Sequence, residues 1–147
     1  MSANTSLHTI GWREWVSLPD LGIPRIKAKV DTGARTSALH AFSVEPYTDD
    51  DGMARVRFGM HPVQRDQDTV VYCDAPVKDR RVVRDSGGHE TERFVIETVV
   101  QLAGQAFSAE VTLTDRDNMM FRMLLGRTAM NGRFAVDPQS SYWAKDK

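Results

Sequence analysis

Apolar and polar residues alternate along most of this chain, which is the period-two pattern of β-strands. Glycine, proline and short polar runs interrupt the pattern at short intervals, as turns do. One short helix is predicted over residues 127–131, ended by Gly132. The segments predicted to be strands are 10–16, 25–30, 38–44, 53–60, 69–77, 81–83, 94–96, 107–114 and 134–136. Many short strands with almost no helix predict an all-β domain, either a closed barrel or a sandwich.

The alternation also predicts which side chains face the core. In the segment 107–114 the inward residues are expected to be Phe107, Ala109, Val111 and Leu113, with Ser108, Glu110 and Thr112 facing outward. In the segment 38–44 one face is expected to carry Ala38, His40, Phe42 and Val44. Two glycine-containing hairpin turns are predicted, one at 49–52 and the other at 86–88.

Length and composition narrow the class of protein. The 147 residues suit one domain over 10–143, with a flexible segment at 1–9 and a tail at 144–147. A net charge of −1 gives no overall field that would attract nucleic acid or a membrane surface. The single Cys73 excludes an internal disulfide and fits a reducing compartment. No apolar run has transmembrane length, and the first residues lack the pattern of a signal peptide, so a cytoplasmic location is expected.

The motif Asp31-Thr32-Gly33 follows the predicted strand 25–30 directly. It places a carboxylate on a tight turn, where Thr32 can hydrogen-bond around it and Gly33 allows close approach of a second backbone. Aspartic peptidases need such a carboxylate, because a pair of them shares one proton and activates a water molecule. The structural alternative is that Asp31 only caps its turn by accepting hydrogen bonds from the next amides. One such motif in a short chain means that the second carboxylate must come from another subunit.

A second motif, 123–127, ends in Gly126-Arg127 and accompanies the first. Together with the stretches 11–23, 27–41 and 112–130, these motifs resemble a bacterial family labelled ATP-dependent zinc protease, which is similar to retropepsin-type aspartic peptidases. The resemblance implies a retropepsin-like closed β-barrel with one short C-terminal helix, and a homodimer. It also implies an association with ATP-grasp ligases that add glutamate to protein C-termini.

The resemblance assigns roles to the residues of the two motifs. Asp31 would be the catalytic acid, paired with its copy at a two-fold axis and supported by Thr32 and Gly33. One carboxylate of the pair stays protonated, because two neighbouring carboxylates cannot both ionise cheaply. The segment that ends at Arg127 would run beside the turn and support it.

The chain departs from the retroviral pattern at Arg35, where retroviral enzymes carry an Asp that pairs with the Arg of the Gly-Arg motif. Together with Ala34, Arg35 and Arg127 are therefore predicted to bind an acidic substrate beside the cleft. A local ion pair of Arg35 with Asp115 or Asp117 is the alternative. The hairpin 80–89 is the candidate flap, with Arg81 and Arg84 as further substrate-binding residues.

The zinc and ATP of the family label find little support in the sequence. There is no H-E-x-x-H and no phosphate-binding G-x-x-x-x-G-K-[ST], and the histidines and Cys73 are scattered without ligand spacing. No metal or cofactor is therefore expected, and a metallopeptidase is the least favoured hypothesis. The first hypothesis is an aspartic peptidase that acts on acidic or glutamate-extended peptide tails. The second is a non-catalytic module that holds an acidic tail for a partner glutamate ligase.

Overall fold

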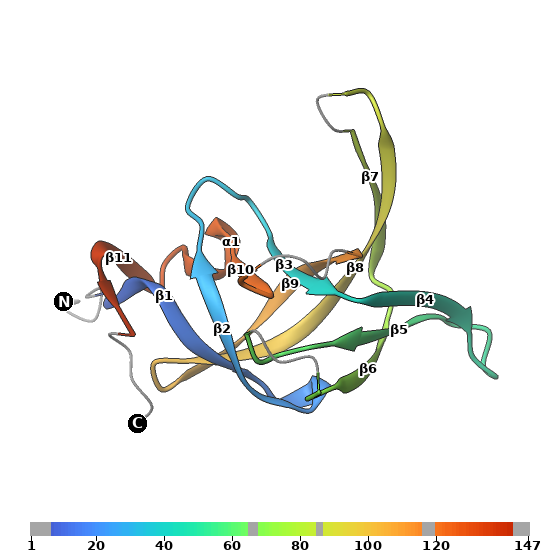
Figure 1. Cartoon of the computed structure of the whole chain (residues 1–147), viewed down its shortest axis with the longest axis horizontal. Helices are drawn as coiled ribbons and strands as arrows, with labels where there is room; N and C mark the ends of the chain where they lie inside the picture. Colours follow the sequence, from blue (N-terminus) through green and yellow to red (C-terminus); the bar gives the residue numbers. More distant parts are fainter. Residues whose placement is uncertain (1–6, 65–67, 85–86, 116–119, 143–147) are drawn as a thin grey trace.

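The computed structural model of the chain describes residues 7–64, 68–84, 87–115 and 120–142. Within them the chain forms β-strands, one 3₁₀ turn and one short α-helix (Figure 1). The strands are β1 (His8–Leu18), β2 (Ile23–Val30), β3 (Ser37–Ala41), β4 (Ser43–Thr48), β5 (Ala54–Met60), β6 (Val71–Pro76), β7 (Asp79–Arg84), β8 (Glu90–Leu102), β9 (Gln105–Asp115), β10 (Met123–Leu125) and β11 (Phe134–Ser141). The 3₁₀ turn is Pro19–Leu21, and the helix α1 is Arg127–Met130.

The main sheet closes on itself. Its strand order is β11-β1-β2-β10-β3-β9-β8-β7, and an additional pairing of Ser17 with Gln101 joins β1 to β8. Within the described residues, β1, β2, β10, β3, β9 and β8 thus form a ring, to which β11 and β7 are attached on the outside. A smaller sheet, β4-β5-β6, packs beside it. This arrangement confirms the closed all-β fold with one short helix.

The hydrophobic core fills the ring and extends under the smaller sheet. Alternate residues of each strand point inward, as the pleat of a β-strand requires. The largest fully buried side chains are Ile10, Glu14, Leu18, Ile23, Ile26, Leu39, Phe58, Met60, Ile96, Leu113, Met123 and Leu125. Burial of the apolar side chains in this set removes their surface from water, which is the main force that holds the fold together.

The predicted strands overlap the observed ones but differ in extent, since 94–96 and 134–136 are only parts of the longer strands β8 and β11. The segment 38–44 is two strands, because the chain bends at Phe42 from β3 into β4. Its burial is also different from the prediction, since Leu39 and Ala41 join His40 among the buried residues while Val44 is only partly buried. In β9 the four residues predicted to face inward are buried, but Thr112 is buried as well, because β3 and β8 flank it. The strand β1 begins at His8, two residues before the predicted strand 10–16.

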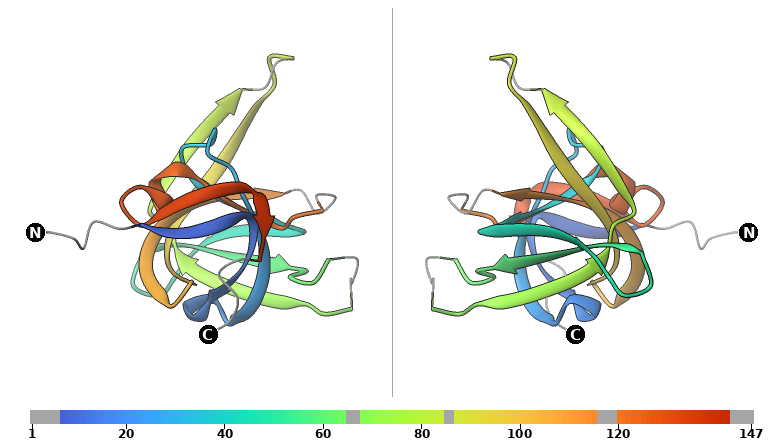
Figure 2. Two further views of the ribbon diagram at one scale, coloured as in Figure 1. Left: turned by 90° about the vertical axis from the view of Figure 1, so that its left-hand side faces the viewer. Right: turned by 90° about the vertical axis from the view of Figure 1, so that its right-hand side faces the viewer.

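Two hairpins project from the ring. The β7–β8 hairpin rises on the side where β2 ends, and the β4–β5 hairpin extends away from the body with the predicted turn 49–52 at its tip (Figures 1 and 2). The strand β11 returns to the beginning of the chain and pairs with β1 in parallel. No helix in the described part of the chain has the length and apolar character needed to cross a membrane.

Candidate active site

Asp31 lies at the end of β2, where the chain turns into β3. The turn is held by hydrogen bonds from the Ala34 amide to the Asp31 carbonyl (3.2 Å) and from the Gly33 amide to the Asp31 carboxylate Oδ1 (3.0 Å). The Asp31 side chain is partly exposed, and Thr32 and Gly33 are exposed. The capping role anticipated as the structural alternative is therefore present. It does not exclude chemistry, because the bond holds one oxygen and leaves the carboxylate at the surface.

The strand β10 fixes the position of this turn. It lies between β2 and β3, parallel to the first and antiparallel to the second, so the turn that joins β2 to β3 passes across its end. The Asp31 amide donates to the Leu125 carbonyl (2.8 Å), and the Arg127 amide donates to the Ala34 carbonyl (2.7 Å). Backbone bonds on both sides of the turn thus hold the Asp31 carboxylate in a set orientation.

Gly126 is required where the two segments cross. A Cβ on Gly126 would lie 2.5 Å from the backbone carbon and oxygen of Thr36, closer than real Cβ atoms approach. The Gly126 amide donates to the hydroxyl of the fully buried Ser37 (3.1 Å). The close approach was expected from the sequence, but the role of Ser37 was not, because a lone serine at the start of a strand carries no pattern.

Arg127 binds the turn itself. Its Nη1 donates to the carbonyl oxygens of Thr32 and Gly33, at 3.3 Å each. The side chain of Arg35 is exposed, and within the described residues no acid forms an ion pair with it. Of the two acids considered as its partners, Asp115 forms no such pair and Asp117 lies outside the described residues. Two guanidinium groups therefore belong to the turn region, one bound to the turn's carbonyls and one in solvent.

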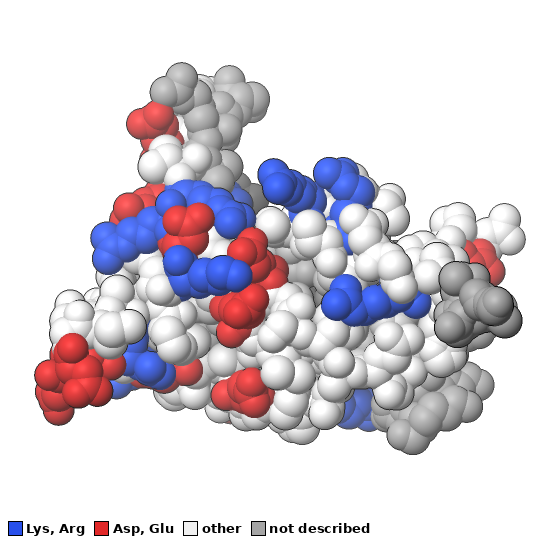
Figure 3. Space-filling model, turned by 180° about the vertical axis from the view of Figure 1, so that it is seen from behind, with Lys and Arg blue, Asp and Glu red and all other residues white. Residues whose placement is uncertain are grey.

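The candidate flap is the β7–β8 hairpin, and its arginines differ in their surroundings. Arg81 is bound to acids, with Nε 3.1 Å from the Asp79 carboxylate and Nη2 3.2 Å from the Glu110 carboxylate. Lys78 adds bonds to Glu110 (3.0 Å) and Glu97 (3.1 Å). Basic and acidic side chains are accordingly intermingled at the root of the hairpin (Figure 3). Arg81 is thus already neutralised by neighbouring carboxylates, while the side chain of Arg84 and the tip residues 85–86 lie outside the described part.

Two cavities lie near the ring, and neither is lined by the described residues of the Asp31 turn. The first, of about 330 Å³, lies where β1 meets the β8–β9 turn. The second, of about 360 Å³, lies between Val44, the Thr91–Phe94 part of β8 and the end of β9. In this single chain, Thr32, Gly33 and Arg35 of the turn are exposed.

The other candidate groups are structural. The Cys73 thiol is buried and lies 3.4 Å from the Leu21 carbonyl, and burial raises its pKa to about 12. His40 is buried and bonded to Thr114, as a structural histidine is expected to be. Among the residues that the structure describes, no three His, Cys, Asp or Glu side chains gather in a way that would hold a metal ion.

Comparison with known proteins adds to this geometry. A family model described as "Retropepsin-like aspartic endopeptidase RimB" matches residues 9–147. The chain belongs to this RimB-like family. The match spans both the Asp31 turn and the segment that crosses it. The resemblance identified from the sequence is confirmed.

Curated relatives of this RimB-like chain carry a different name. It is 45% identical over 138 residues to a protein of Shewanella pealeana and 46% identical over 138 residues to one of Desulfotalea psychrophila, each named "Probable alpha-L-glutamate ligase". These matches cover 94% of this chain but 30% of each relative. The chain therefore spans about a third of the length of the curated relatives it matches.

A solved structure shows the same fold. The crystal structure of a Legionella pneumophila protein of unknown function aligns with a TM-score of 0.77 and 24% sequence identity, covering 95% of this chain and all of the other. At this level of identity the likeness concerns the arrangement of strands alone.

Proposed function

We propose that this chain is an aspartic peptidase that acts as a homodimer, with Asp31 as the one catalytic carboxylate of each subunit. The observation that carries the proposal is the carboxylate at the surface of a turn that is fixed by β10 and by Arg127. Membership of a family described as aspartic endopeptidases supports it. A peptidase dyad needs two carboxylates, and the open surface around Asp31 suits a cleft that is completed only by a second subunit.

The chemistry follows from the pairing of two Asp31 side chains. The ionised carboxylate takes a proton from a water molecule, whose oxygen attacks the carbonyl carbon of the scissile bond. The protonated carboxylate donates its proton to the carbonyl oxygen. Collapse of the tetrahedral intermediate then transfers a proton to the leaving amine and breaks the C–N bond. Thr32 and Gly33 keep the carboxylates in position, and Arg127 holds the turn through its two carbonyl contacts.

The proposed substrate is an acidic peptide, in particular a glutamate-extended protein tail. Arg35 is an exposed cation four residues after the catalytic carboxylate, and Ala34 lies between them on the turn. The names of the relatives support a partnership with a glutamate ligase, because those proteins contain a segment similar to this chain within a much longer one. Under this proposal the ligase extends the tail and this chain shortens it. Neither zinc nor ATP takes part in the reaction.

The testing experiment is mass-spectrometric analysis of a peptide that ends in oligoglutamate. Wild type and Asp31→Asn are incubated with it, each with and without a chelator. Asparagine keeps the size of the side chain but cannot act as the base, so we expect chelator-resistant cleavage by wild type and at least a 1,000-fold loss in the variant, on the order of the loss of an essential catalytic group. Cleavage by the variant at the wild-type rate would remove Asp31 from the mechanism.

A second candidate function is a binding module that holds an acidic tail for the ligase. The observation that favours it is that this segment forms part of proteins named for ligation and not for hydrolysis. Tight binding of the oligoglutamate peptide by wild type without any product would select this function. Activity that is abolished by the chelator and restored by zinc would instead indicate a metallopeptidase.

A further inference from the structure

The outer face of β1 and β2 carries positive side chains that no proposed role has used. In β2 the outward residues are Arg25, Lys27 and Lys29. They alternate along the strand with the buried Ile26 and Ala28. In β1 Arg13 pairs with Lys29 across the strands, and cross-strand partners share a face of the sheet. We call Arg13, Arg25, Lys27 and Lys29 the β1–β2 cationic track.

Aromatic rings support this track. The Arg25 guanidinium lies 4.1 Å from the centre of the Trp15 ring, and Lys27 Nζ lies 5.1 Å from the same centre. Tyr142 stacks on Trp15 with ring centres 5.9 Å apart, and Arg13 lies 5.0 Å from the Tyr142 ring. Such contacts hold the long basic side chains against the sheet and reduce the entropy that they lose when a ligand binds.

Arg13, Lys27 and Lys29 of the track differ from two other basic regions of the described chain, because those two regions are paired with acids. The cations at the root of the β7–β8 hairpin and those of β5 are paired with carboxylates, through Glu110 in the first case and Asp74 in the second. Among the described residues, no ion pair joins Arg13, Lys27 or Lys29 to an acid. The one acid in the sequence of β1 and β2 is Glu14, and it is fully buried. The positive charges of Arg13, Lys27 and Lys29 therefore remain available for an anionic ligand.

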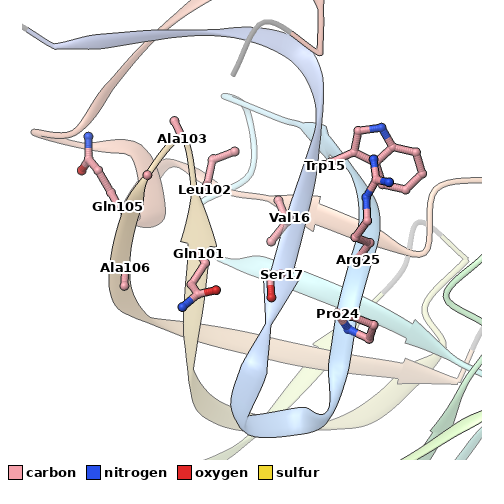
Figure 4. A pocket seen from close by; sticks show the side chains of 11 residues that line it. Trp15, Val16, Ser17, Pro24, Arg25, Gln101, Leu102, Ala103, Gln105 and Ala106 are labelled. Carbon is pink, nitrogen blue, oxygen red and sulfur yellow. The ribbon is translucent and has the colours of Figure 1, made fainter. Parts of the chain in front are cut away.

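The position of the track links it to the proposed catalytic site. The strand β2 runs straight into the turn that carries Asp31, so Lys29 is two residues from the catalytic carboxylate (Figure 1). At its other end Trp15 and Arg25 also line the cavity of about 330 Å³, together with the side chains of Ser17, Gln101 and Gln105 (Figure 4). The track thus leads from a polar cavity at the start of β2 to the catalytic turn.

We infer that the β1–β2 cationic track binds the acidic tail of a peptide in extended form and leads it to Asp31. The spacing supports this ligand, because alternate side chains of an extended peptide are about 6.6 Å apart, the same spacing as alternate residues of β2. The distance from Arg25 to Asp31 is six residues of strand, or about 20 Å, so about six tail residues would span it. The inference rests on the proposed function for its substrate class. A peptide fits better than single-stranded nucleic acid, since bases need open aromatic faces and cations already lie over the Trp15 ring.

The experiment measures binding apart from cleavage. Fluorescein-labelled peptides that end in two, four, six, eight or ten glutamates are titrated against Asp31→Asn by fluorescence anisotropy. The track variant adds Lys27→Gln and Lys29→Gln, and the matched control adds Arg55→Gln and Arg57→Gln, which remove two ion-paired cations at alternate positions of β5. Circular dichroism verifies that each variant is folded. The single variant Lys29→Gln, which removes an exposed side chain, provides a second test if the double variant fails to fold.

We expect the track variant to weaken binding of the longest tail about ten-fold, the control less than two-fold, and Lys29→Gln alone about three-fold, as exposed charge pairs would give. Affinity should rise with tail length and level off near six glutamates. Each of three results would overturn the inference. The track and control variants could bind equally well, no peptide could bind, or oligouridylate RNA could bind as tightly as the oligoglutamate peptides. Binding on the track without cleavage by wild type would overturn the peptidase alone. Cleavage that Lys27→Gln and Lys29→Gln leave unchanged, when they are introduced into wild type with Asp31 intact, would overturn the track alone.

Discussion

At the scale of single residues, the candidate site depends on close backbone contacts that a larger side chain would break. Gly126 passes the backbone of Thr36 at a distance that excludes any side chain, and its amide is bonded to Ser37. Arg127, the next residue, binds the carbonyls of the Asp31 turn. The contacts that hold the Asp31 turn are therefore made mainly by backbone atoms. A substitution at Gly126 would disturb them by steric clash and not by removing a hydrogen-bonding group.

Gly126→Ala tests this close approach. The added methyl group would meet backbone atoms of Thr36, which cannot move away as the end of a flexible side chain can, so we expect the free energy of unfolding to fall by about 2 kcal/mol or more. Urea denaturation followed by tryptophan fluorescence measures the change. Gly33→Ala is the control for stability, because its Cβ would approach only the Asp31 carboxylate, at 3.3 Å. Equal stability of the two variants would contradict the steric argument.

At the scale of elements, the β7–β8 hairpin is tied to the ring by a charge network. Hydrogen bonds from Lys78 and from Arg81 lower the pKa of the Glu110 carboxyl in β9. Arg81, which the sequence predicted as a substrate-binding residue, forms one of these contacts with Glu110. The network belongs to the root of the hairpin, so it positions the candidate flap without contributing free charge to a substrate.

The network makes the stability of the fold depend on pH. Because the folded-state pKa of Glu110 is lowered, its contribution is fully present above the unfolded-state pKa of about 4.3 and is lost as the pH falls through the folded-state value. We expect Glu110→Gln to be less stable than wild type at pH 7, by a small amount because the groups are partly exposed. The difference should be smaller at pH 3, because the Glu110 carboxylate is progressively protonated as the pH falls. Urea midpoints of both proteins at the two pH values measure it, and a difference that is unchanged at pH 3 would contradict the assignment.

At the scale of the whole molecule, the ring of strands presents half of a proposed active site. One chain supplies one Asp31, and the turn that carries it is exposed. The strand β11 pairs with β1 of the same chain, and the Tyr142 amide donates a hydrogen bond to the Arg13 carbonyl. Residues 140–142 at the end of β11 thus lie against their own chain.

A mixing experiment tests the shared site. If each active site needs one Asp31 from each subunit, a nine-fold excess of Asp31→Asn should draw most wild-type chains into mixed dimers. The activity per wild-type chain should then fall about ten-fold after subunit exchange, because random pairing leaves about a tenth of these chains with a wild-type partner. Peptide cleavage before and after mixing gives the result, with sedimentation to verify the dimer. Unchanged activity would show that a single chain is sufficient.

The sequence alone determined the local structure and the candidate catalytic residue. Alternating side chains predicted nearly every strand, because the pleat of a strand forces alternate residues to opposite faces. The motif at Asp31 and the glycine at 126 were recognisable because turns and close crossings accept few residue types. The sequence did not reveal Ser37 beneath Gly126 or the two strands within 38–44, since neither depends on a local pattern.

Only the tertiary structure decided which charges are free. Arg81 and Lys27 look alike in the sequence, as basic residues within alternating strands. Folding places Arg81 against Glu110, twenty-nine residues away, whereas Lys27 lies over Trp15 with no described acid beside it. The availability of a charge depends on contacts between distant strands, and the closure of the ring sets those contacts. For this reason the structure adds the outer face of β1 and β2 to the acidic-substrate residues that the sequence predicted at the Asp31 turn and on the β7–β8 hairpin.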